Sequence, residues 1–80
     1  MPEDVMFQQA VDALRNGQRA RSRDLLTRLL RVDPNNSQYW LWLSAAVDTP
    51  KEQIYCLQSA LRSDPNNSTT RQGLILLGAL

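Results

Sequence analysis

The chain has no histidine and a single cysteine, Cys56, among its 80 residues. The absence of histidine removes the commonest general base and the Ser-His and Cys-His pairs of nucleophilic catalysis. One cysteine cannot form an intramolecular disulfide, and no Cys/His set is left to bind zinc. With three glycines, the sequence also has no glycine-rich phosphate loop. These absences argue against an enzyme and predict neither a metal site nor a cofactor.

An excess of charge and a long apolar run are also missing. Nine basic and eight acidic residues give a net charge of +1, which makes nucleic acid an unlikely partner for the chain as a whole. The longest apolar run, residues 73–80, is far shorter than the ~20 residues that cross a bilayer. The first residues are acidic, unlike a signal peptide. Because a lone cysteine in an apolar pattern is typical of a reduced core position, we expect a cytoplasmic protein without a membrane segment.

An internal repeat is the most informative feature that is present. Residues 30–37 recur as residues 61–68, with seven of the eight residues unchanged at an offset of 31. Self-similarity at such a period is typical of stacked helical repeats. Each copy contains Asp-Pro-Asn-Asn, which ends one helix and turns the chain. Ser37 and Ser68 then follow as the expected N-caps of the next helices.

Apolar residues spaced three and four apart predict five helices, over about residues 3–16, 18–32, 38–47, 49–63 and 68–79. Gly17 supplies the stop of the first helix. Thr49, three residues before Glu52 and next to Pro50, gives the fourth helix the clearest N-cap in the chain. No segment alternates with period two over the length of a strand. The sequence therefore predicts one all-α domain over residues 1–80, made of antiparallel helix hairpins joined by short turns.

This arrangement resembles the tetratricopeptide repeat (TPR) family over essentially the whole chain. In a first repeat, at residues 3–36, the family's preferred small, glycine, large apolar and proline residues are matched by Ala10, Gly17, Leu26 and Pro34. In a second repeat, at residues 37–67, its tryptophan, leucine, bulky, alanine and proline positions are matched by Trp40, Leu43, Leu57, Ala60 and Pro65. Residues 68–79 would form a capping helix. The resemblance implies a short right-handed α-solenoid.

Three residues and one turn depart from the family pattern. Gln9 stands where the family has leucine, and Ser22 and Gln53 stand where it has alanine. The second repeat is three residues short, and the missing length falls at residues 48–50.

The resemblance also implies a function. Similar proteins bind a peptide or a helix on the concave surface lined by the first helix of each hairpin, which makes this chain a non-enzymatic protein-binding module. The expected groove residues are Asp4, Phe7, Val11, Leu14, Gln38, Leu41, Trp42, Ala45, Asp48, Thr69, Gln72 and Leu76. Because the lysine and asparagine set that grips a terminal carboxylate in some members is absent, an apolar peptide or helix fits better than an acidic tail. Packing between helices is the alternative to a groove role, and we favour it for Leu14, Leu41 and Trp40. For Trp42 both alternatives stay open.

Two other surfaces keep further alternatives open. The last helix carries leucine or isoleucine at four successive positions, 74–77, where a terminal cap is normally polar. This face could continue into a further repeat, pair two copies as a homodimer, or bind a partner. Arginines also crowd the start of the second helix, so an anion patch is an alternative to a solvated face; its residues would be Arg19, Arg21, Arg23 and Arg28.

Overall fold

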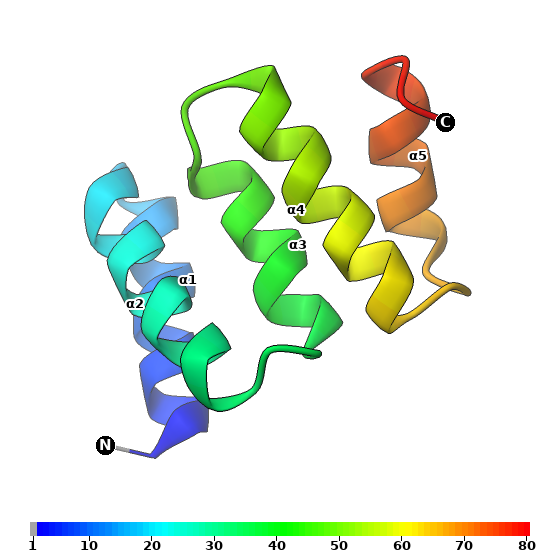
Figure 1. Cartoon of the computed structure of the whole chain (residues 1–80). Coiled ribbons are helices and arrows are strands. Elements are labelled where there is room, and N and C mark those ends of the chain that lie inside the picture. Colours follow the sequence, from blue (N-terminus) through cyan, green and yellow to red (C-terminus); the bar gives the residue numbers. More distant parts are fainter. Residues whose placement is uncertain (1) are drawn as a thin grey trace.

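This computed structural model describes residues 2–80 of the chain, and this part contains five α-helices and no strand. The helices are α1 (Glu3–Arg15), α2 (Arg19–Val32), α3 (Ser37–Ala46), α4 (Pro50–Ser63) and α5 (Ser68–Leu76). Turns of three or four residues join them, so neighbouring helices run antiparallel (Figure 1). The all-α prediction is confirmed.

The helices form two hairpins, α1–α2 and α3–α4, that stack side by side, with α5 against α4 (Figure 1). The central helix α3 packs on α1, α2 and α4. This explains why α3 is apolar on almost every side, since it has neighbours in several directions. None of the helices in residues 2–80 has the length and apolar character needed to cross a membrane.

Small residues lie where the helices approach most closely. Ala10, Ala46 and Ala60 are completely buried, which lets the backbones of neighbouring helices come near one another. Leucines from α2 and α3 fill the space between the hairpins. Cys56 is buried in the same core as a free thiol, and its expected role as a small core residue is confirmed.

The N-caps of α3 and α5 differ from the sequence prediction. Asn36 rather than Ser37 precedes α3, and its side-chain oxygen accepts from the backbone N–H groups of Gln38 and Tyr39 at 3.0 and 3.3 Å. Asn67 likewise accepts from the N–H of Thr70 at 3.0 Å. The prediction of serine caps was wrong because asparagine is at least as good a cap, and the turn ends one residue earlier than expected.

The cap of α4 is as predicted. The hydroxyl oxygen of Thr49 accepts from the backbone N–H of Glu52 at 3.2 Å, and the hydroxyl donates to the Glu52 carboxylate at 2.9 Å. Pro50 occupies the first helical position, where its missing N–H costs nothing.

Glycines with positive φ end both α1 and α5. Gly17 has φ of 77° and Gly78 has φ of 72°, a left-handed conformation that suits glycine. After each of them the chain folds back: Gln18 N–H donates to the Ala13 carbonyl and Ala79 N–H to the Leu74 carbonyl, as in a Schellman motif. Gly17 is the predicted stop. Gly78 ends α5 earlier than the expected residue 79.

Candidate partner-binding surfaces

The predicted groove residues that lie close together form two separate groups on the side built by α1, α3 and α5. The first group is the predicted pair Phe7 and Trp42, which forms an aromatic cluster with Tyr39, a residue that was not predicted for the groove. The ring centroids of Phe7 and Trp42 are 6.5 Å apart in an edge-to-face arrangement, and those of Phe7 and Tyr39 are 5.2 Å apart. Phe7 and Trp42 are half-buried, whereas Tyr39, which packs on Phe7, is buried. The cluster thus presents two partly exposed aromatic rings on a fixed base.

Charged groups flank the aromatic cluster at both ends. The Arg15 guanidinium lies 6.0 Å from the centroid of the Trp42 ring, within the range of a cation–π contact. At the other end, the hydroxyl of Tyr39 donates to the Glu3 carboxylate at 3.5 Å. Burial, with the nearby charges of Glu3 and Asp33, raises the pKa of Tyr39, so this phenol stays a neutral donor.

The second group lines a hollow between α3 and α5, which we call the α3–α5 hollow. Its volume is about 360 Å³, and α4 forms its floor through Leu57. Leu41, Thr69 and Leu76, all predicted groove residues, line it. Gly73 also lines it, and a Cβ at that position would lie 3.1 Å from Cδ1 of Leu57. The glycine therefore allows α5 to pack closely on α4.

The remaining predicted groove residues are scattered. Gln38, Ala45, Gln72 and Asp4 are exposed, and Leu14 is half-buried against the core. Val11 is only 5% exposed, so it packs inside the domain and presents no surface to a partner. Its prediction as a groove residue is corrected. The spacing of apolar residues by three and four positions fixes the direction of a side chain around the helix axis only to within part of a turn. The sequence therefore could not tell whether Val11 faces the groove or the core.

Asp48, also predicted in the groove, instead pairs with two arginines of the expected anion patch. Its carboxylate lies 3.4 Å from the Arg19 guanidinium and 2.8 Å from that of Arg23. Arg19 also donates to the carbonyl of Val47. Arg28 pairs with Asp24 on its own helix at 3.0 Å. Three of the four arginines thus face acids of the chain itself, which lowers the attraction of the patch for a free anion.

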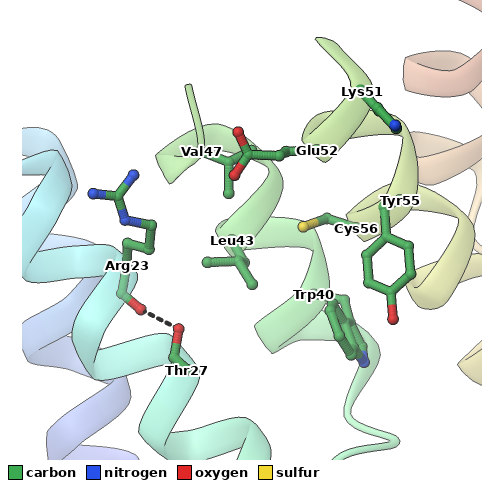
Figure 2. Close-up of a pocket in the computed structure, with 9 residues that line it drawn as sticks. All are labelled: Arg23, Thr27, Trp40, Leu43, Val47, Lys51, Glu52, Tyr55 and Cys56. Carbon is green, nitrogen blue, oxygen red and sulfur yellow. Dashed lines mark hydrogen bonds between the residues drawn. The ribbon is translucent and has the colours of Figure 1, made fainter. Parts of the chain in front are cut away.

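The sequence did not predict the pocket shown in Figure 2, which lies between α2 and α4 with α3 as its floor. Its volume is about 440 Å³, and it is lined by Leu43 of α3, Val47 of the turn that follows α3, and Cys56 of α4. Burial, and secondarily the charge of Glu52, raises the pKa of the Cys56 thiol to about 11. The thiol is therefore protonated near neutral pH and a poor nucleophile.

Two aromatic residues border the same pocket. Trp40 and Tyr55 meet edge to face, with centroids 5.8 Å apart. The indole of Trp40 donates to the carbonyl of Pro34 at 2.8 Å, so the ring is fixed, and its half-burial agrees with its expected packing role. Tyr55 is 58% exposed. A tyrosine on the outer, polar side of the fourth helical pattern was the one feature in the sequence that could have indicated this pocket.

Within residues 2–80, no three acidic or cysteine side chains gather where they could hold a metal ion. No protein-family model matches the chain, and no curated protein resembles it significantly in sequence.

Proposed function

We propose that this chain is a non-enzymatic protein-binding module of TPR-like helical hairpins, and that it binds an apolar peptide or helix on its α1–α3 side, in a cytoplasmic setting. The observation that carries the proposal is the aromatic cluster. Phe7 and Trp42 come from the first helices of the two hairpins and meet at their junction. A partner that crosses this junction contacts both hairpins at once.

The aromatic cluster has the properties of a binding hot spot. Tryptophan and tyrosine are enriched among the residues that contribute most to binding, and rigid partly exposed rings lose little entropy on association. Tyr39, which is buried, holds Phe7 in place at 5.2 Å. The surface is therefore preorganised, which lowers the cost of binding.

The neighbouring residues indicate what kind of partner fits. Ala45 and Gln38 are exposed on the same helix as Trp42 and carry no charge. Arg15, above the Trp42 ring, is the cation nearest to that ring. We therefore expect a peptide or amphipathic helix with an apolar face, with one acidic residue placed to meet Arg15.

A selection from a displayed library of helical peptides tests the proposal. The selected peptides are resynthesised and titrated against the chain, and binding is measured by calorimetry. We expect Trp42→Ala to weaken binding by at least about 30-fold, in line with the loss of a hot-spot side chain. Circular dichroism checks that the variant keeps its helices.

Tyr55→Ala is the matched control, because Tyr55 is also a partly exposed aromatic residue in an edge-to-face pair but lies beside the α2–α4 pocket. It should bind the peptides like the unmodified chain. Equal losses in the two variants would contradict the aromatic cluster as the site. Selection of peptides that ignore Trp42 and respond only to Tyr55 would move the binding site to the pocket in Figure 2.

A further inference from the structure

We propose that the exposed face of α5 pairs with the same face of a second copy of this chain, with Leu76 of each copy seated in the α3–α5 hollow of the other. This inference concerns the end of the molecule away from the aromatic cluster and does not rest on the proposed peptide site. Its starting point is the exposure of Leu76, which is 87%.

The patch is self-complementary in shape. A strongly exposed leucine stands at the rim of a hollow of about 360 Å³, and Leu76 itself is one of the residues that line it. With a two-fold axis beside Leu76, the Leu76 side chain of each copy enters the hollow of the other copy. A closed dimer needs this kind of patch, because both subunits must use the same surface.

The charges in and around the hollow also favour a second copy. Every residue that lines the hollow is uncharged, including Leu41, Leu57, Gly73 and Leu76. Two identical patches therefore meet without like-charge repulsion between their linings. By contrast, the α2–α4 pocket is bordered by Arg23, Lys51 and Glu52, whose charges a docking apolar face would have to desolvate.

The opposite end of the stack does not fit α5. There, α1 exposes Gln8 and Asp12, which are bonded to each other at 3.0 Å, and α2 exposes the Arg28–Asp24 ion pair. A head-to-tail chain of copies would bury these polar groups against leucines, at a cost in desolvation. The α5 face therefore favours a closed pair rather than an open fibre.

The size of the patch sets the strength of the pair. A stable interface buries about 800 Å² on each partner, roughly a sixth of the 4999 Å² exposed by this chain. Three side chains at the C-terminal end of α5, Ile75, Leu76 and the C-cap residue Leu77, supply the exposed apolar part. Such a patch falls below that size, so we expect a weak, reversible dimer whose population depends on concentration.

Sedimentation equilibrium of the purified chain over a wide range of concentrations provides the test. The average mass should rise from 9.1 kDa toward twice that value as concentration increases. Leu76→Lys should reduce the association constant by roughly 100-fold or more, because the symmetric contact is lost twice. Circular dichroism should show unchanged helix content, since the side chain is exposed.

Two comparisons make the result specific. Val32→Lys alters a residue of α2 that is 68% exposed, and it should dimerise like the unmodified chain. A chain that stays at its monomer mass at every concentration overturns the proposal. So does a Val32 variant as disruptive as Leu76→Lys. Since Trp42→Ala leaves α5 unchanged, its dimerisation separates this inference from the peptide site.

Discussion

The guanidinium of Arg23 on α2 donates a 2.8 Å hydrogen bond to the carboxylate of Asp48, 25 residues further along the chain. Arg19 reaches the same carboxylate at 3.4 Å. Asp48 lies in the turn between α3 and α4, which has three residues, as many as the turn between α1 and α2. The second hairpin is three residues shorter because α3 has 10 residues where α1 has 13, so the expectation that the missing length falls at residues 48–50 was wrong. The pair therefore joins the start of α2 to the turn of the next hairpin.

Asp48→Asn should lower the free energy of unfolding by less than about 1 kcal/mol, because both side chains of the ion pair are partly exposed. The loss should shrink in high salt, which screens such pairs. Urea unfolding at low and at high salt measures both effects. Asp24→Asn, which breaks an ion pair within one helix, should cost less. An unchanged stability at low salt would show that the Asp48 pair does not hold the hairpins together.

Ser22→Ala should stabilise the fold by about 1 kcal/mol. The Ser22 side chain is fully buried and its hydroxyl has no hydrogen-bond partner in the described structure; an unpaired buried hydroxyl costs about 1–3 kcal/mol. Alanine also has the higher helix propensity. Ser59 is the control, because its hydroxyl donates to the Tyr55 carbonyl at 2.9 Å and accepts from Arg62. Thermal unfolding should show that Ser22→Ala raises the melting temperature and that Ser59→Ala does not raise it.

Asn36→Ala should destabilise the fold by about 1 kcal/mol, since it removes the acceptor for two backbone N–H groups at the start of α3. Ser37→Ala should change stability by less than about half of that, because Ser37 is already inside the helix. Chemical denaturation of the two variants makes the comparison. A larger loss from Ser37→Ala would restore serine as the cap.

Local chemistry made much of the fold predictable. Gly17, Thr49 and the Asp-Pro-Asn-Asn turns act within a few residues, and the helices begin and end within a few residues of their predicted limits. The cap assignment failed at Asn36 and Asn67 because two good capping residues stand side by side, and the backbone angle at each decides which one caps.

The surfaces were less predictable, because they depend on residues far apart in sequence. Nothing near Arg23 indicates that Asp48 will pair with it. The α2–α4 pocket likewise needs three helices to be placed before it exists. Burial of Val11 depends on how far α1 is rotated against its neighbours, which the spacing of apolar residues leaves open by part of a turn.

Stability should fall in alkaline solution through Cys56. Its thiol has a pKa of about 11 in the fold against 9.0 ordinarily, so the unfolded chain releases a proton that the folded chain keeps. The free energy of unfolding should be independent of this group below about pH 9 and decrease toward pH 11, by roughly 2 kcal/mol.

The comparison with Cys56→Ala isolates this effect, because Tyr39 titrates in both proteins. Urea unfolding measured at several alkaline pH values should give a shallower loss of stability for the variant. Parallel losses in the two proteins would mean that the thiol is more accessible than its burial indicates.

The turn after α5 has a further consequence for engineering. Gly78 directs the chain out of α5 with the same pattern of backbone hydrogen bonds that Gly17 uses to lead α1 into α2. The backbone at the end of α5 thus has the conformation that follows the first helix of the α1–α2 hairpin. A helix copied from α2 and grafted after Gly78 would inherit a turn that already points it back along α5, so the stack can be lengthened at this end without designing a new connection.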